Sequence, residues 1–359
     1  MTATQTTDPG SDPSDANGPT AAERVVRAAP ALLAIAFFVA FSALVLSHRE
    51  RMIEPDPYAY RASIAALENG DLTLDQQQYD ALSTQLQQTS LGGGIAQWRQ
   101  DSDGMWVSEK NPGYPFLAVA FDEIGAMRLA PLFYGALACL ALWFGARRWL
   151  GRWGGTFAVG AYCSTTVGMV MAWRSFMPTF TDASLVAAGL GLLIWTALAV
   201  DRRWAHRVLT GALACFALAL GVFVRYTNVT VLAVAAAFAL LICLQRRWGL
   251  GWRALPWMAL GAIVPLVASL AYNAAVFSGP FSTGYRSSDV KFTLSAISGN
   301  WKVMPKNLWE AMPIFVLGLI AVVVLFVMQI VLAVRARRTQ EPLATDAPDR
   351  PTEAGPIDR

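Results

Sequence analysis

Long apolar stretches, each about the length of a membrane-spanning helix, dominate this sequence. A helix needs roughly 20 apolar residues to cross the hydrocarbon core of a bilayer. The stretches that meet this requirement are residues 28–47, 129–146, 154–173, 179–200, 208–224, 228–245, 255–277 and 312–334. Only 15% of the residues are charged, and the charges lie between the stretches. A soluble domain cannot bury so much uninterrupted apolar surface, so the sequence predicts an all-α, polytopic membrane protein with about eight transmembrane helices.

Arginine clusters between these stretches predict how the chain threads the membrane. Basic residues concentrate in loops on the cytoplasmic side. The clustered arginines are Arg24, Arg27, Arg147, Arg148, Arg152, Arg202, Arg203, Arg207, Arg246, Arg247, Arg253, Arg335, Arg337 and Arg338. Placing all of them in the cytoplasm puts both termini there. It also leaves two large outer loops, residues 48–128 and 278–311.

The first outer loop contains a short apolar segment, residues 113–121. This segment has about half the length of a helical span, and a crossing there would move every later arginine cluster to the wrong side. We therefore expect it to dip into the outer surface of the membrane or to lie on it. Apolar residues at helical spacing in segments 60–68 and 75–88 predict two amphipathic interfacial helices in the same loop.

Both ends of the chain differ in composition from the apolar stretches. Residues 1–22 and 339–359 are rich in proline, aspartate and small polar residues, which predicts disordered cytoplasmic tails around a membrane domain at 23–338. No small-residue cleavage site follows the first stretch, which ends at Ser47, so we interpret it as a retained signal anchor. The four cysteines lie in apolar stretches and only two histidines occur, a pattern that predicts no metal site.

Asp56 lies between two prolines at the start of the first outer loop, in the segment Glu54-Pro55-Asp56-Pro57-Tyr58. Pro57 disfavours helical backbone at the residue before it, and Pro55 has a fixed φ. We therefore expect Asp56 in a stiff, extended segment, where a carboxylate could act as a positioned general base. The alternative is a solvated acid in a proline-rich turn.

Two further charged residues lie at predicted outer ends of spans. Asp182 falls in the first turn of the stretch that starts at 179, where it could be catalytic or could only favour the helix dipole. Arg225 closes the stretch 208–224 among aromatic residues. It could extend its side chain to the interface, or its planar guanidinium could bind a phosphate.

Four segments, taken in order, resemble motifs of the GT-C class of integral-membrane glycosyltransferases. The nearest resemblance is to the family of protein O-mannosyltransferases and lipid A aminoarabinose transferases. The segments are Pro55-Asp56-Pro57-Tyr58 with the following residues to Gly70, Asp103 to Leu117 with its Pro-Gly-x-Pro motif, Arg174 to Asp182, and Val224-Arg225-Tyr226-Thr227-Asn228. Together they extend over about residues 30–310. The sequence departs from the family at one position, because Pro57 stands where the family has a second acid.

The resemblance implies transfer of a sugar from a polyprenyl-phosphate donor to a cell-envelope glycan, lipid or protein on the outer face. It implies no cofactor, no metal and no nucleic-acid partner. Asp56 and Asp182 would be catalytic, and Arg225 and Lys110 would bind the donor phosphate. The candidate substrate-binding residues are Tyr58, Tyr114, Tyr285 and Arg286.

Two other functions remain open on the sequence. The first is a non-catalytic assembly or scaffold protein with the same fold. The second is a lipid or small-molecule transporter, although transporter sites tend to lie at the bilayer midplane on broken helices. The predicted spans carry almost no charge in their interiors, and Pro265 is the clearest interruption.

Overall fold

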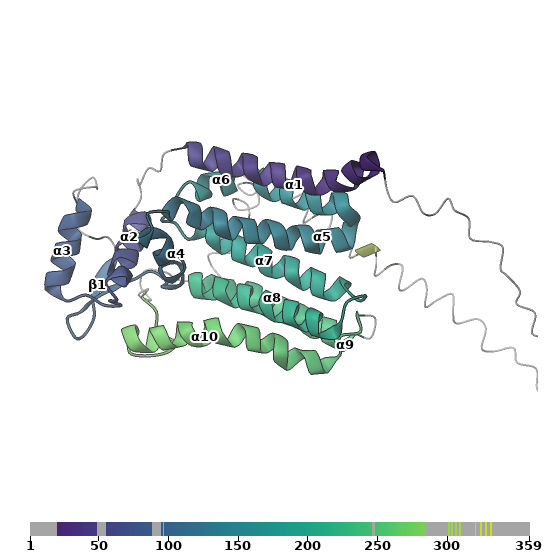
Figure 1. Cartoon of the computed structure of the whole chain (residues 1–359). Coiled ribbons are helices and arrows are strands. Elements are labelled where there is room, and N and C mark those ends of the chain that lie inside the picture. The colour runs from purple at the N-terminus through teal and green to yellow at the C-terminus, as the bar shows by residue number, and fades with distance from the viewer. Residues whose placement is uncertain are drawn as a thin grey trace, which may run out of the picture. The chain divides into compact units, whose positions relative to one another are not determined.

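The computed structural model describes residues 20–48, 55–87, 95, 97–245 and 248–284, with single residues between 301 and 331. All the helices and strands below belong to one compact unit, Met1–Val290, and Lys291–Arg359 forms a second unit. The predicted stretch 312–334 therefore lies almost entirely outside the described residues. Within the first unit, long helices run alongside one another as a bundle (Figure 1).

Six helical segments in the described part of the chain are long and apolar enough to cross a membrane. They contain the helices α1 (Ala21–Ser47), α5 (Ala130–Cys163), α7 (Thr179–Leu198), α8 (Trp204–Val224), α9 (Val229–Leu244) and α10 (Leu255–Phe277). Short 3₁₀ turns extend three of them at the N-terminal end: Met127–Leu129 before α5, Tyr226–Asn228 before α9 and Trp252–Ala254 before α10. This confirms the prediction of an all-α, polytopic membrane protein.

Helix α5 is longer than one span because its chain folds back on itself. Gly151, with φ +76°, interrupts the helical backbone. The Sγ atoms of Cys139 and Cys163 lie 3.8 Å apart, whereas 24 residues of straight helix would separate them by about 36 Å. The second limb is followed by α6 (Thr166–Ala172) after a break. The first limb therefore corresponds to the predicted stretch 129–146, whereas the predicted stretch 154–173 is divided between the second limb, which ends at Cys163, and α6.

The arginine-rich loops of the described residues lie at one end of the bundle, on the right in Figure 1, and charged side chains connect them. Arg152, just after the turn in α5, donates to the carbonyl of Arg27 near the start of α1 over 3.4 Å. Arg148 pairs with Asp201, which follows α7, over 2.8 and 3.1 Å. We call this the arginine end.

The opposite end carries the folded outer loop. Its elements are α2 (Pro55–Glu68), α3 (Gln76–Gln87), the antiparallel strands β1 (Trp98–Gln100) and β2 (Trp106–Ser108), and α4 (Gly113–Glu123). The helices α2 and α3 overlap the predicted segments 60–68 and 75–88, and α4 contains the short apolar segment. Buried side chains of α2 and α4, among them Ile64 and Tyr114, pack in one cluster with Leu185 of α7 and Val224 of α8.

The expected extended conformation of Asp56 is wrong, because Asp56 lies in the first turn of α2. The first backbone N–H groups of a helix have no acceptor within the helix, so Pro55 and Pro57 lose no hydrogen bond there. The carboxylate also interacts favourably with the positive end of the helix dipole. These two effects therefore outweigh the preference of a residue before proline for extended backbone.

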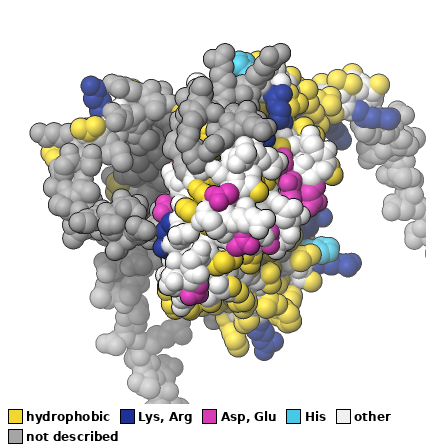
Figure 2. All heavy atoms as spheres, turned by 90° about the vertical axis from the view of Figure 1, so that its left-hand side faces the viewer, with side chains coloured by type: hydrophobic (Ala, Val, Ile, Leu, Met, Phe, Trp, Pro, Cys, Tyr) yellow, Lys and Arg dark blue, Asp and Glu magenta, His cyan; other side chains and the backbone are white. Residues whose placement is uncertain are grey.

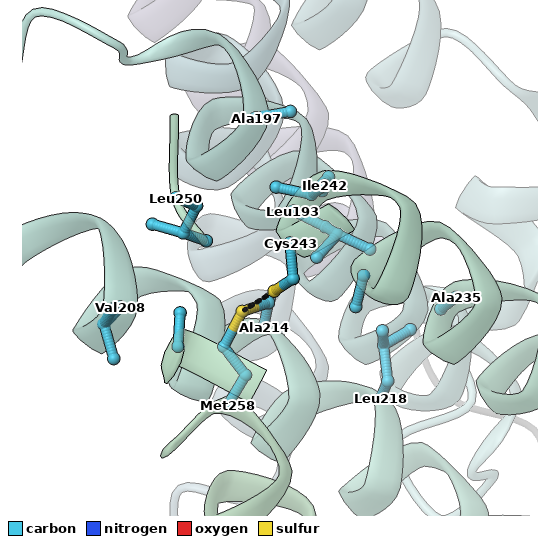
Figure 3. Packing of buried hydrophobic residues seen from close by; sticks show 12 residues of the cluster. Leu193, Ala197, Val208, Ala214, Leu218, Ala235, Ile242, Cys243, Leu250 and Met258 are labelled. Atoms are coloured by element: carbon cyan, nitrogen blue, oxygen red, sulfur yellow. Dashed lines mark hydrogen bonds between the residues drawn. The ribbon is translucent and has the colours of Figure 1, made fainter. Parts of the chain in front are cut away.

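Small residues allow the helices of the bundle to approach closely. A Cβ atom on Gly145 of α5 would lie 2.4 Å from the carbonyl oxygen of Gly191 on α7, and one on Gly191 would lie 2.6 Å from the backbone of Ala141. Toward the arginine end, α7 to α10 enclose an apolar core in which Cys243 Sγ contacts Met258 Sδ over 3.9 Å (Figure 3). Packing of small residues is the usual basis of helix association in lipid.

We predict that Gly191→Ala destabilises the bundle, because its methyl group would collide with the rigid backbone of Ala141 and force α5 and α7 apart. The thermal unfolding midpoint of the detergent-solubilised protein should fall by at least several degrees. Gly221→Ala in α8 is the matched control, since its Cβ would meet nothing nearer than 3.4 Å. Equal midpoints for the two variants would contradict the close α5–α7 contact.

Candidate active site

Asp56 is held in an ion pair at the end of the bundle opposite the arginine end. Lys110 Nζ lies 3.0 Å from Asp56 Oδ1, and Gln97 Nε2 donates to the same oxygen over 2.8 Å. The Lys110 side chain is 8% exposed, whereas that of Asp56 is 35% exposed. Both contacts use Oδ1, and within the described part of the chain Oδ2 takes part in no hydrogen bond. The carboxylate is therefore oriented through Oδ1, and the Asp56 side chain remains partly exposed.

The β-hairpin formed by β1 and β2 positions Lys110 beside Asp56. Leu74, in the connection between α2 and α3, exchanges two backbone hydrogen bonds with Trp106 of β2 over 2.7 and 2.9 Å. The indole of Trp98 on β1 donates to the carbonyl of Ala59 on α2 over 3.4 Å. The backbone N–H of Lys110 then donates to Ser108 Oγ over 3.2 Å. The hairpin thus attaches to α2 on the side that carries Asp56.

Gln97 is a site residue that the sequence analysis missed. Its backbone φ is +63°, a conformation that few residues other than glycine and asparagine adopt. The Gln97 carbonyl accepts a hydrogen bond from the N–H of Glu109 over 2.9 Å, which fixes this backbone beside Lys110. Strained backbone of this kind is concentrated at functional sites. No pattern in the sequence marks the glutamine, because both its φ and its contact with Asp56 come from the tertiary fold.

Asp182 and Arg225 belong to a second polar cluster at the same end of the bundle. Asn228 Nδ2 donates to Asp182 Oδ1 and, over 3.0 Å, to the carbonyl of Gly221. Arg225 Nη1 lies 4.0 Å from Asp182 Oδ2. The Asp182 side chain is 10% exposed and that of Arg225 is 45% exposed. The buried carboxylate thus anchors the half-exposed guanidinium.

The two clusters are linked by direct packing of α4 on α8. A Cβ atom on Gly113 would lie 2.4 Å from the carbonyl carbon of Phe223 and 2.6 Å from the nitrogen of Val224. Lys110 precedes Gly113 by three residues, and Arg225 directly follows Val224. Figure 2 looks onto this end of the molecule, where acidic side chains gather over the middle and hydrophobic ones lie around them. The residues predicted to be catalytic or phosphate-binding therefore share one end of the bundle.

The predicted substrate-binding residues are placed differently from one another. Tyr58 is half-buried on α2, two residues after Asp56. Tyr114 has no exposed surface and donates its hydroxyl hydrogen bond to the carbonyl of Ser175. We therefore correct its assignment, because a side chain enclosed in the core offers no surface to a substrate. Tyr285 and Arg286 lie outside the described residues.

A pocket beside Lys110 brings aromatic side chains to the site. Trp98, Phe116 and Tyr272 of α10 are among the residues that line it. The ring of Phe116 stacks on Phe223, with centroids 5.9 Å apart, and meets Tyr272 edge-on. The buried Asn111 next to Lys110 has an Oδ1 with no hydrogen-bond partner among the described residues. Lys110 thus belongs both to this aromatic-lined pocket and to the ion pair with Asp56.

Among the described residues no group of three or more histidine, cysteine or acidic side chains could hold a metal ion. In comparisons with protein-family models, with curated proteins and with solved structures, none matched this chain. The resemblance to GT-C glycosyltransferases therefore stays a prediction from the sequence. The chemistry of the site has to be argued from the contacts above.

Two carboxyl groups, those of Glu68 and Asp122, lie close together at the ends of α2 and α4. Burial raises the pKa of Glu68 at the end of α2, and the charge of Asp122 near the end of α4 raises it further. Burial also raises the pKa of Asp122, against the opposing effect of Arg61. A raised pKa means that the folded protein holds the proton more tightly than the unfolded chain does. The pair therefore favours folding at low pH, and this contribution is lost as the pH rises through the raised values.

We predict that Glu68→Gln raises the thermal unfolding midpoint at pH 7 by roughly 1–2 °C, because it removes one of two repelling charges. The difference from wild type should shrink as the pH falls through the raised pKa values, because the two carboxyl groups become protonated. Asp103→Asn, an exposed acid on the turn of the β-hairpin, is the control and should show no such pH dependence. A Glu68→Gln effect that does not change with pH would contradict the interpretation that charge repulsion between the two carboxylates destabilises the fold.

Proposed function

We propose that this protein is a membrane glycosyltransferase that moves a sugar from a polyprenyl-phosphate donor to a hydroxyl group of a cell-envelope acceptor. The observation that carries the proposal is the state of Asp56. One carboxylate oxygen is fixed by a buried lysine and a glutamine amide, and the side chain remains 35% exposed at the end of a helical bundle. A general base needs both an orientation and access to the proton it removes.

In the reaction, the acceptor hydroxyl oxygen attacks the anomeric carbon of the donor sugar, and Asp56 Oδ2 takes the hydroxyl proton. The new bond joins that oxygen to the anomeric carbon. The bond between the anomeric carbon and the phosphate oxygen breaks, and its electron pair leaves with the polyprenyl phosphate.

Arg225 is the group best suited to the departing phosphate. Its guanidinium is half exposed, and Asp182 holds it by charge from the buried side. A planar guanidinium stabilises the charge that develops on phosphate oxygens as the bond breaks. Asp182 would then act through Arg225 and Asn228 as a positioning residue, and its small exposure fits that role better than contact with substrate.

Lys110 takes a different role from the one expected on the sequence. Its ammonium group pairs with Asp56 Oδ1, and its side chain is nearly buried. Lys110 would therefore orient the base, and it is a weaker candidate for binding the donor phosphate. Phe116 of α4 and Tyr272 of α10 supply an aromatic surface beside the same pocket, and the ring of Phe116 packs on the buried Phe223 of α8. Such a surface suits the apolar prenyl chain of a donor that approaches from the bilayer.

The proposed orientation places the arginine end in the cytoplasm and the active site outside, with about eight spans and both termini cytoplasmic. The loop arginines that were assigned to the cytoplasm, such as Arg148 and Arg152, lie at the end of the bundle opposite Asp56, and this supports it. A transporter is less well supported, because Asp182 and Arg225 lie at helix ends, whereas transporter sites usually lie at the midplane.

We predict that Asp56→Asn lowers the rate of sugar transfer at least about 100-fold, since the amide cannot accept the hydroxyl proton. The assay follows transfer from a radiolabelled polyprenyl-phosphate sugar in membranes that contain the full-length protein. Asp103→Asn serves as the control for a lost carboxylate at the same end. Equal turnover by wild type and Asp56→Asn would rule out the proposed base, and turnover by neither would favour a scaffold protein.

We also predict that Arg225→Gln lowers kcat about 100- to 1,000-fold, as loss of one preorganised charge at a developing anion does. Arg225→Lys should recover only part of this, because an ammonium group lacks the two-pronged geometry of the guanidinium. The measurement is kcat and KM in the same assay, with Arg253→Gln at the arginine end as control. Unchanged kcat and KM for Arg225→Gln would show that this side chain only extends toward the membrane–water interface and has no role in the reaction.

A further inference from the structure

The arginine end contains a cavity of about 710 Å³ between α5, α7 and α8. Small-molecule sites fall in the range of about 300–1,000 Å³. Its lining residues are Phe144, Arg147, Arg148, Leu192, Trp195, Asp201, Arg202 and Thr210. Phe144 of α5 and Leu192 and Trp195 of α7 lie farther from the end of the bundle than the charged lining residues, which come later in the chain on α5 and just after α7. The cavity therefore has an apolar inner wall and a charged rim.

The rim carries an excess of positive charge. Arg148 makes a two-pronged contact with Asp201, and Arg202 Nε lies 3.5 Å from the same carboxylate. The guanidinium of Arg147 lies 4.9 Å from the ring centroid of Trp143. Three guanidinium groups and one carboxylate leave a net charge of +2. Planar guanidinium groups suit phosphate oxygens, which they can contact with two parallel hydrogen bonds.

An apolar path leads from the cavity toward the middle of the bundle. Leu137, Leu140 and Phe144 of α5 lie on one helix face, at spacings of three and four residues, and all three are exposed. On α8, the exposed Leu213 follows the cavity residue Thr210 by three residues. A free phosphate would contact the rim alone, whereas a phosphate that carries an acyl chain could use both the rim and this path.

Exposed tryptophans mark the level of the rim. They are Trp149, Trp153, Trp204 and Trp252, and all lie next to the arginine-rich loops. Tryptophan concentrates where the hydrocarbon core meets the headgroups of a bilayer. The charged rim of the cavity therefore lies at the depth at which lipid phosphates occur.

From these observations we propose that the cavity binds the headgroup phosphate of an anionic phospholipid. The guanidinium groups of Arg147 and Arg202 contact the phosphate oxygens, and an acyl chain follows the stripe of Leu137, Leu140 and Phe144. The site lies at the opposite end of the bundle from Asp56 and is independent of the proposed transferase activity.

The test is a binding titration of the full-length, detergent-solubilised protein by microscale thermophoresis with dioctanoyl phosphatidylglycerol. The double variant Arg147→Gln/Arg202→Gln should bind about 30-fold more weakly than wild type, at about fivefold for each basic residue near the phosphate. The control Arg24→Gln/Arg253→Gln removes the same charge from exposed positions at the same end and should change binding less than twofold. Thermal unfolding verifies that both variants fold.

Two further titrations of the wild-type protein decide the source of the phosphate without any variant. Dioctanoyl phosphatidylcholine should bind at least tenfold more weakly than the phosphatidylglycerol, because it carries no net charge. Competition by sn-glycerol 3-phosphate as strong as that by the lipid would assign the site to a soluble anion and overturn the lipid proposal. Equal binding of the two lipids, or an equal loss in the control and the rim variant, would overturn it as well.

Discussion

The need to satisfy every backbone polar group without water determines the architecture of this protein. Within a bilayer only the chain itself can satisfy these groups, so long apolar segments become helices and their ends need special partners. Two arginines provide such partners. Arg128 Nη2 lies within 3.2 Å of the carbonyls of Val45, Leu46 and His48 at the end of α1. The buried Arg207 donates to the carbonyl of Thr196 near the end of α7.

The same constraint explains why the polar chemistry lies at the ends of the bundle. A carboxylate in the middle of a span would need a costly internal partner, whereas one at a span end can be paired and reached by substrate. Asp56 and Asp182 both occupy the first turn of a helix, α2 and α7 respectively. Each has a cation and an amide around it: Lys110 with Gln97, and Arg225 with Asn228. The two clusters thus repeat one solution to the same electrostatic problem.

Hydrophobic periodicity and length were sufficient to predict the six long apolar helical segments of the described residues, because burial in lipid leaves few alternatives, but they did not predict the break between α5 and α6 inside the stretch 154–173. They also located the short helices of the outer loop to within a few residues, apart from the start of α2. Local rules failed at Asp56, where the requirements of a helix N-terminus outweighed the preference of a residue before proline. They also could not find the Asp56–Lys110 pair, which depends on a β-hairpin that contacts α2 across more than 40 residues. Gln97 was missed for the same reason.

Charge divides the molecule into two ends with different roles. At one end, acids are oriented by single basic residues, and the Asp56 side chain stays partly exposed, an arrangement suited to proton transfer. At the other end, guanidinium groups outnumber carboxylates, and exposed tryptophans lie among them, an arrangement suited to a lipid interface. A bundle anchored by lipid phosphates at its arginine end would be fixed in depth and tilt. Asp56 and Arg225 would then lie at a constant height at the opposite surface, which is where the proposed chain-anchored donor would present its phosphate.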